Sequence, residues 1–201
     1  MQNINQKKLE QLAQIFQEKN QQINLSAIRD LEGIKIKHIQ DSLELNKILK
    51  LPAGKKFCDI GTGGGFPLLP LAITNPEVTF HGIDARRKKV DTVNGFIDAL
   101  NLSNAKVLRG RIENFASKKA YQASFDYISA RAVGYVDKLF AWATPLLKTG
   151  GCFILYKQAN PEEYDAMMKL LKKYHLTLEK KHTYQLFEGD IQRVIYVIKK
   201  T

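Results

Sequence analysis

The sequence contains little cysteine. Only Cys58 and Cys152 occur among its 201 residues, and both lie inside apolar runs that predict buried strands. A disulfide framework needs several cysteines and an oxidising compartment. We therefore expect no disulfide, and a protein that works in the reducing environment of the cytoplasm.

Long apolar runs are missing as well. A helix that crosses a membrane needs roughly 18 or more consecutive apolar residues, and no segment approaches that length. Residues 1–20 are polar and rich in glutamine, without the apolar centre of a secretory signal. These features predict a soluble cytoplasmic chain with no membrane partner.

Metal-ligand spacing is also absent from the sequence. The histidines His38, His81, His175 and His182 are scattered, and none lies near a cysteine or second histidine at the spacing of a zinc site. No Ser-His-Asp arrangement is apparent either. We expect no metal ion in the working protein.

Acidic residues are outnumbered by basic ones. The sequence has 31 Lys and Arg against 20 Asp and Glu, which gives a formal net charge of +11. Clustered cations gain free energy by neutralising phosphates and releasing counterions, so this surplus favours nucleic acid as the partner. The alternative is a basic protein without such a partner. Hydrophobic residues make up 44% of the chain, enough for the core of one domain with an accessory segment.

The first quarter of the chain predicts helices and no strands. Apolar residues recur at helical spacing from Leu9 to Phe16. Two more helical stretches follow Asp30, which has the residue type and position of an N-cap. We therefore expect residues 1–54 to form a helical cap that packs on a main domain of residues 55–201.

Strands and helices alternate in the main domain. The expected strands cover residues 57–60, 78–83, 106–109, 127–129, 152–156, 176–184 and 193–198, and the expected helices cover 66–73, 86–100, 135–144 and 161–174. This alternation predicts an α/β fold with a doubly wound, mostly parallel seven-stranded sheet and helices on both faces. A short turn joins the last two strands, which predicts an antiparallel pair.

A glycine-rich loop lies between the first expected strand and helix, and it reads D-x-G-x-G-x-G from Asp59 to Gly65. Ligands of open α/β sheets bind at the carboxyl ends of the strands, where glycine lets the backbone approach them closely. Phe66 occupies the place of the third glycine of a dinucleotide fingerprint, and no Lys-Ser/Thr follows as in a phosphate loop. Gly61, Gly63 and Gly65 are therefore candidate cofactor contacts, and a purely structural turn is the alternative.

Asp84 ends the second expected strand. A carboxylate at that place accepts hydrogen bonds from the hydroxyls of an adenosine ribose and repels a 2′-phosphate. The alternative is an N-cap for the next helix, and the two roles are compatible. Asp84 is therefore a candidate contact to an adenosine-containing cofactor.

The loop and Asp84 together resemble the class I S-adenosylmethionine methyltransferases, which have a Rossmann-like fold. The longer run from Asp59 to Ile73 is similar to the glucose-inhibited division protein B family. Further matches are residues 24–30, His38 with residues 41–43, and residues 129–132. The resemblance covers most of the chain between Asn24 and Lys157. Leu68 departs from the pattern, because the family usually has glycine there, and this puts the packing of the following helix in question.

The resemblance implies a reaction and its partners. Members of the family methylate N7 of a guanine in 16S ribosomal RNA with S-adenosylmethionine as the cofactor. The partner is then small-subunit ribosomal RNA or the assembling 30S particle, and we expect a monomer. The implied cofactor contacts are Gly61, Phe66, Ile112, Glu113 and Arg131. For Phe66 and Ile112 the alternative is an ordinary place in the core.

Methylation of guanine N7 is consistent with a sequence that has no Ser-His-Asp arrangement and no metal-ligand spacing. Guanine N7 carries a lone pair and no proton, so its methylation needs no general base. Orientation of the reacting atoms can supply up to about 7–11 kcal/mol. Arg131, at the end of the fourth strand, is expected to position the cofactor or the base, with a surface ion pair as the alternative. His38 and Asp41, three residues apart on a helix, predict a structural hydrogen bond rather than catalysis.

The candidate RNA contacts are basic residues: Arg29, Arg86, Arg87, Lys88, Arg109, Arg111 and Lys157. The run from Arg86 to Lys89 opens a helix, where each cation opposes the helix dipole by roughly 0.3–1 kcal/mol. An RNA-facing patch explains that placement, and a solvated charge run is the alternative. Two other functions stay open: a class I methyltransferase with another substrate, and an RNA-binding module without catalysis. Phe66 disfavours an NAD-dependent dehydrogenase.

Overall fold

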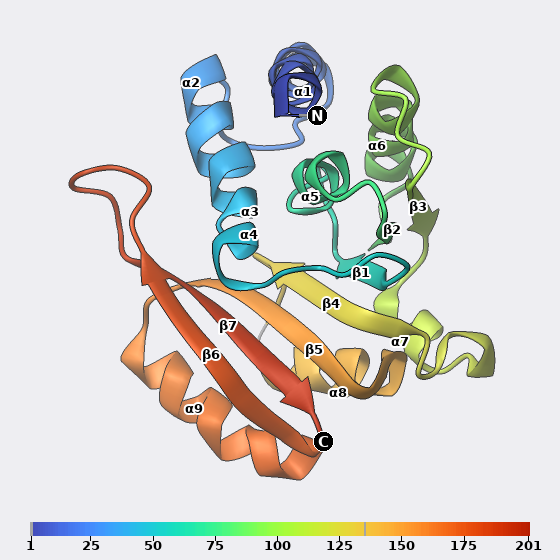
Figure 1. Ribbon diagram of the computed structural model, residues 1–201, viewed down its shortest axis with the longest axis vertical. Coiled ribbons are helices and arrows are strands. Elements are labelled where there is room, and N and C mark those ends of the chain that lie inside the picture. Colours follow the sequence, from blue (N-terminus) through green and yellow to red (C-terminus); the bar gives the residue numbers. More distant parts are fainter. Residues whose placement is uncertain (1, 135) are drawn as a thin grey trace.

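Seven strands form one sheet in the order β3-β2-β1-β4-β5-β7-β6 (Figure 1). The computed structural model describes residues 2–134 and 136–201. The strands are β1 (Lys56–Ile60), β2 (Thr79–Asp84), β3 (Ala105–Arg109), β4 (Phe125–Arg131), β5 (Leu147–Gln158), β6 (Leu176–Tyr184) and β7 (Arg193–Lys200). Strands β1 to β5 pair in parallel, whereas β7 is antiparallel to β5 and β6 is antiparallel to β7. The predicted mostly parallel sheet and its antiparallel final pair are confirmed.

Helices cover both faces of the sheet (Figure 1). One face carries α1 (Gln2–Ile23), α5 (Leu68–Thr74) and α6 (Arg87–Ala99), and the other carries α7 (Ile112–Ala116), α8 (Val136–Leu146) and α9 (Pro161–Leu171). Two short 3-10 turns are η2 (Lys119–Tyr121) and η3 (Lys172–Tyr174). The predicted start of α8 at Tyr135 lies outside the described residues. Among the described helices, none has the length and apolar character needed to cross a membrane.

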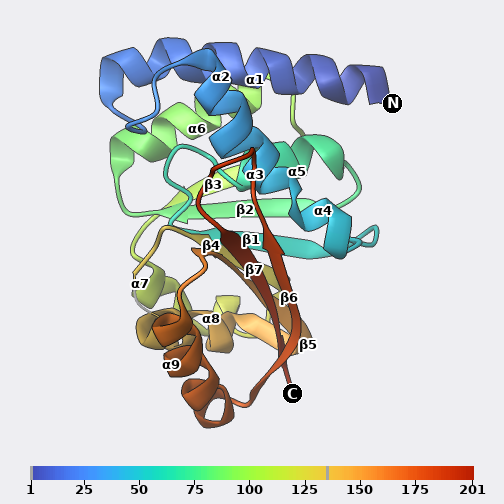
Figure 2. The ribbon, with the colours of Figure 1, turned by 90° about the vertical axis from the view of Figure 1, so that its left-hand side faces the viewer.

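The segment after α1 is a run of helical turns rather than two separate helices. It consists of α2 (Leu31–Ile34), the π-helical η1 (Lys35–Gln40), α3 (Asp41–Leu43) and α4 (Leu45–Ile48). The side chain of Asp30 accepts a hydrogen bond from the Gly33 N–H at 2.6 Å, so the predicted N-cap is confirmed. The run extends from α2 beside α1 to α4 near the start of β1 (Figure 2), and it lies along β6, where Asp41 contacts Tyr184 and Glu44 contacts His182.

Helix α1 packs on the glycine loop through one side chain. Phe16 is fully buried, and its ring meets the Phe66 ring edge to face with 5.0 Å between centroids. A Cβ at Gly64 would lie 2.8 Å from Cε2 of Phe16, closer than carbon atoms can approach. The absence of a side chain at Gly64 therefore lets the N-terminal helix rest directly on the loop.

Leu68, which replaces the glycine usual in the resembling family, is accommodated by a glycine on the sheet. Leu68 opens α5 and is fully buried. A Cβ at Gly82 on β2 would lie 3.0 Å from Cδ2 of Leu68. Leu68 thus fills space that Gly82 leaves open, and α5 keeps its contact with the sheet.

Candidate active site

The glycine loop follows β1 and is fastened to the end of β2. Gly61 has a φ of +70°, in the left-handed region that favours glycine, and its N–H donates to the Ile83 carbonyl at 2.8 Å. The Gly63 N–H donates to Oδ2 of Asp84 at 2.9 Å, and the Arg86 N–H donates to Oδ1 at 2.8 Å. Asp84 therefore joins the loop to the start of α6, while Arg86 itself is the N-cap residue of that helix.

A cavity of about 280 Å³ opens beside Asp84, and we call it the Asp84 cavity. It brings together four predicted cofactor contacts from three different loops: Gly61, Asp84, Ile112 and Glu113. Ile112 and Glu113 reach it because the short helix α7 begins directly after β3. The side chain of Val133 also lines this cavity and packs on Gly61.

A second cavity, of about 250 Å³, lies on the other side of Gly61, and we call it the Phe66 cavity. Gly63, Phe66 and Arg131 line it, as predicted contacts, and Ser26 and Lys89 line it as well. Gly61 borders both cavities, so one elongated ligand that crosses Gly61 reaches all these residues. Of the predicted loop contacts only Gly65 lines neither cavity; its bare Cα accommodates the side chain of Leu69.

The loop has room and polar groups for such a ligand. A Cβ at Gly63 would meet nothing closer than the Gly61 carbonyl oxygen at 3.7 Å, so the backbone there faces open space. Asp59, two residues before Gly61, is fully buried, and burial raises the pKa of its carboxyl to about 6. Its Oδ1 accepts a hydrogen bond from Ser129 at 2.6 Å, while Oδ2 has no partner among the described residues. A cationic ligand group would stabilise that carboxylate.

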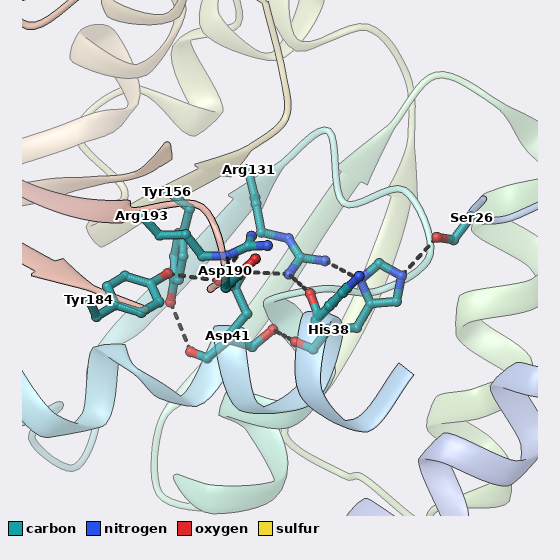
Figure 3. A network of polar contacts seen from close by, with 10 residues as sticks. Ser26, His38, Asp41, Arg131, Tyr156, Tyr184, Asp190 and Arg193 are labelled. Atoms are coloured by element: carbon teal, nitrogen blue, oxygen red, sulfur yellow. Dashed lines mark hydrogen bonds and ion pairs between the residues drawn. The ribbon is translucent and has the colours of Figure 1, made fainter. Parts of the chain in front are cut away.

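Arg131 is the centre of a polar network that joins three segments (Figure 3). Its Nη1 donates to Oδ2 of Asp41 at 2.8 Å, and its Nη2 donates to Nδ1 of His38 at 3.0 Å. The guanidinium carbon lies 5.6 Å from the centroid of the Phe66 ring. The predicted structural role of His38 and Asp41 thus takes the form of two bonds to Arg131.

The direction of each hydrogen bond in this network follows from arginine chemistry. A guanidinium can only donate, so Nδ1 of His38 accepts and the ring proton sits on Nε2. Nε2 then donates to Oγ of Ser26, 2.8 Å away. Burial, and next the charge of Arg131, lower the pKa of His38 to about 3, so its ring is neutral at physiological pH.

Asp41 also connects this network to the β6–β7 hairpin. Its Oδ1 accepts a hydrogen bond from the Tyr184 hydroxyl at 2.8 Å and lies 3.5 Å from Nη1 of Arg193. Arg193 also pairs with Asp190 at 3.2 Å. Asp41 is only 2% exposed, so these cations and donors compensate a buried charge (Figure 3).

A third cavity, of about 440 Å³, lies on the far side of Arg131, and we call it the Tyr156 cavity. It shares His38, Arg131 and Ala132 with the Phe66 cavity. Its other polar lining comes from Lys37, Asp41, Tyr156, Lys157, Gln158, Glu163, Tyr184 and Arg193. Two ligands bound in the Phe66 and Tyr156 cavities would meet beside Arg131, which is the arrangement that group transfer between them requires.

The predicted RNA contacts lie in three places. Arg86 and Arg111 line the Asp84 cavity, with Arg87, Lys88 and Arg109 close to them in sequence. Arg87 forms an exposed pair with Asp91 at 3.4 Å. Arg29 lies between α1 and α2 and donates to the Asn24 side chain.

Lys157 of β5 differs from the other predicted RNA contacts because it is largely buried. Its Nζ lies 2.6 Å from Oε1 of Glu163. Val133, Tyr184 and Arg193 line these cavities and were not predicted, and Lys89 of the basic run lines the Phe66 cavity. Tyr184 and Arg193 had no local signal, because their partner Asp41 lies more than 140 residues earlier in the chain.

In residues 2–134 and 136–201 no group of three or more His, Cys, Asp or Glu side chains is placed to hold a metal ion.

Comparison with known proteins gives consistent matches. The family model described as "GidB: rRNA small subunit methyltransferase G" matches residues 5–193. "Ribosomal RNA small subunit methyltransferase G" of Caldanaerobacter subterraneus subsp. tengcongensis is 35% identical over 90% of this chain and 76% of that protein. The protein of the same name from Leuconostoc citreum is 34% identical over 98% of this chain and 84% of that protein.

The fold has counterparts among solved structures. A SAM-dependent methyltransferase from Aquifex aeolicus superposes with a TM-score of 0.63 at 16% identity, covering 85% of this chain and 94% of that one. SAM-dependent methyltransferase structures from Methanosarcina mazei give a TM-score of 0.60, also at 16% identity, covering 75% and 94% of the two chains. At this identity the likeness concerns the fold alone, and it confirms the expected class I architecture.

Proposed function

This chain belongs to the rRNA small subunit methyltransferase G family, and on that premise we propose that it transfers a methyl group from S-adenosylmethionine to N7 of a guanine in 16S ribosomal RNA. It is an S-adenosylmethionine-dependent methyltransferase. One observation carries the choice of reaction: the cavities that adjoin the glycine loop meet a separate, larger cavity at Arg131. Donor and acceptor sites are thus adjacent, and His38, which lines both, is neutral at physiological pH because its pKa is lowered to about 3.

The Asp84 and Phe66 cavities would hold the cofactor, whose sulfonium supplies an electrophilic methyl group when it is bound. Asp84, Ile112 and Glu113 line the Asp84 cavity. Asp84 would accept hydrogen bonds from the ribose, Ile112 would give an apolar wall to the adenosine half, and Glu113 would make a polar contact beside it. On the other side of Gly61 the backbone at Gly63 and the ring of Phe66 would enclose the methionine part. Gly65 has no side chain, so the side chain of Leu69 packs directly against the loop at this position.

The residues between the two sites hold groups in place and do not move protons. Guanine N7 has a lone pair and no proton to lose, so attack on a methyl group needs orientation only. Arg131 is fixed by Asp41 and His38 at 2.8 and 3.0 Å, which gives it one position at the boundary of the two cavities. His38 is neutral at physiological pH because its pKa is lowered to about 3, and it acts as a fixed acceptor for Arg131.

The chain's remaining parts fit an RNA substrate. Residues 1–54 would form a cap that closes the Phe66 cavity through Ser26 and His38. Arg29 on the cap and the basic cluster of Arg86, Arg87, Lys88, Arg109 and Arg111 would contact phosphates on either side of the cavities. The partner would be small-subunit RNA or the assembling 30S particle in the cytoplasm, bound by a monomer.

Methyl transfer to RNA tests the proposal directly. Small subunits from cells that lack the protein are incubated with the purified chain and tritiated S-adenosylmethionine, and the RNA is digested to nucleosides. We expect label in 16S RNA as 7-methylguanosine. Label at another atom, in protein or in a small molecule would refute the acceptor. Binding of RNA and S-adenosylhomocysteine without any transfer would refute catalysis.

A further inference from the structure

A lysine–carboxylate pair lies in the Tyr156 cavity beside the proposed reaction centre. Nζ of Lys157 is 2.6 Å from Oε1 of Glu163, and the two side chains are 14% and 34% exposed. Lys157 stands near the carboxyl end of β5, and Glu163 lies in the first turn of α9. The N-cap side chain of Asn160 accepts the Glu163 N–H at 3.0 Å, so the backbone that presents the carboxylate is fixed.

Glu163 is the carboxylate of this cavity that is available to a ligand. The other lining carboxylate, Asp41, has both oxygens engaged, with Arg131 on one side and Tyr184 and Arg193 on the other. Among the described side chains, the Glu163 carboxylate has a hydrogen bond or ion pair only with Lys157, through one of its two oxygens. A planar ligand in the cavity therefore meets a free acceptor next to an ammonium donor.

Guanine has the matching edge. Its O6 accepts a hydrogen bond, and the adjacent N1–H and N2–H₂ donate two in the same plane. Resting on the proposed function, we propose that Lys157 and Glu163 read this edge, with Lys157 donating to O6 and Glu163 accepting from N1–H and N2–H₂. They would determine specificity for guanine in the Tyr156 cavity, which takes a base extruded from the RNA stack.

The same contacts place N7 toward the donor site. Around the guanine ring the order is N2, N1, O6 and then N7, so N7 lies next to the group that Lys157 binds. Lys157 also donates to the carbonyl of Gly134 at 3.4 Å, in the loop that follows Arg131. Lys157 is thus tied to the loop after β4, and that loop begins with Ala132, which with Arg131 lines both the Tyr156 and the Phe66 cavities. This assignment gives Lys157 a base edge as its RNA contact, in place of a phosphate.

Adenine would be rejected by the same pair. It presents an amino donor where guanine has O6, so two donors face each other at Lys157. It presents an acceptor at N1, so that nitrogen faces the carboxylate of Glu163. Unpaired polar groups of this kind give strong discrimination between substrates, because each loses its water without gaining a partner.

Inosine provides the decisive substrate, because it keeps O6, N1–H and N7 and lacks only the N2 amino group. The position methylated by the wild type is mapped first, and then RNA or reconstituted small subunits carrying guanosine or inosine at that position are compared by kcat/KM. Losing a hydrogen bond to a charged group predicts a wild-type preference for guanosine of roughly 10- to 100-fold. Glu163→Gln should lower kcat/KM on guanosine RNA by a similar factor and shrink the preference to a few-fold.

Glu162→Gln is the matched control, since Glu162 is the exposed neighbour in the same helical turn and lines none of the cavities. It should keep the wild-type rate and the wild-type preference. Affinity for S-adenosylhomocysteine should stay unchanged in both variants. Glu163→Asp, which withdraws the carboxylate by one methylene, is a second variant that should also reduce the preference.

The outcomes separate the two proposals. If the wild type transfers no methyl group to small-subunit RNA, the proposed function fails before the variants are compared. If the wild type methylates guanosine RNA and Glu163→Gln keeps the full preference over inosine, the reading of the guanine edge is overturned. An equal loss on both RNAs also overturns it, because a merely structural role would act on both alike.

Discussion

Gly64→Ala tests whether this glycine serves the packing of the cap rather than the ligand. The new Cβ would lie 2.8 Å from Cε2 and 3.3 Å from Cζ of Phe16, which is fully buried and has little room to move. Overpacking of this kind costs about 1–3 kcal/mol. In a chain of this size that corresponds to a fall in melting temperature of roughly 2–12 °C. Circular dichroism at 222 nm during a thermal scan measures the fall.

The same substitution in a Phe16→Leu variant tests whether the cost of Gly64→Ala comes from the Phe16 ring. Phe16→Leu removes the ring atoms that Gly64→Ala would strike, so in that background the alanine should cost less than in the wild type. Residues in contact show coupling energies of about 0.5–3 kcal/mol, and we expect a value in that range. An alanine that is equally harmful in both backgrounds, or harmless in both, would refute the argument from Phe16.

Three further changes probe the cofactor site, the RNA surface and the network. Gly63→Val should abolish binding of S-adenosylhomocysteine, measured by calorimetry, with the fold kept: the side chain would fill the open space beside the loop and demand a strained φ of +56°. Retained affinity would mean that the site lies elsewhere. Arg87→Glu with Lys88→Glu should weaken RNA binding and lower the slope of log K against log salt by about 2, while sparing the cofactor, since neither residue lines a cavity as Arg86 does. An unchanged slope would exclude this patch. His38 has a folded pKa of about 3 against 6.5 unfolded, so the unfolded chain binds the extra proton and stability falls as pH drops below 6.5. This residue should account for a loss of about 2 kcal/mol between pH 7 and pH 5, and urea unfolding of His38→Gln should lack that part of the pH dependence.

The fold was predictable because local pattern and topology agree. Strands and helices alternate from residue 56 onward, and such alternation has few solutions other than a parallel sheet covered on both faces. The glycine loop and Asp84 were predictable as neighbours because the ends of adjacent parallel strands meet at one edge. Helix α7 was missed because its five residues are too few to show a helical period.

The boundary at Arg131 between the two proposed ligand sites could not be predicted from local sequence patterns. It depends on Asp41, which lies on a short helical turn and contacts Arg131 at the end of β4, Tyr184 at the end of β6 and Arg193 at the start of β7. None of these residues has a sequence neighbour that signals the partner. They meet only because tertiary packing places the run α2–α4 beside the end of β4 and the β6–β7 hairpin.

This dependence on distant segments has a consequence for the cap. Asp41 and Arg131 are both shielded from water, and removing one partner of a buried pair typically costs about 3–5 kcal/mol, because the other charge stays behind without compensation. A sheet without residues 1–54 would lose both Asp41 and His38 as partners of Arg131, whose guanidinium would then face water without a fixed position, and it would also expose the glycine loop where Phe16 now covers it. The cap and the sheet therefore share one energetic unit at the place where the reactants would meet. We infer that residues 1–54 cannot be removed without losing the fixed position of Arg131, whatever stability the isolated sheet retains.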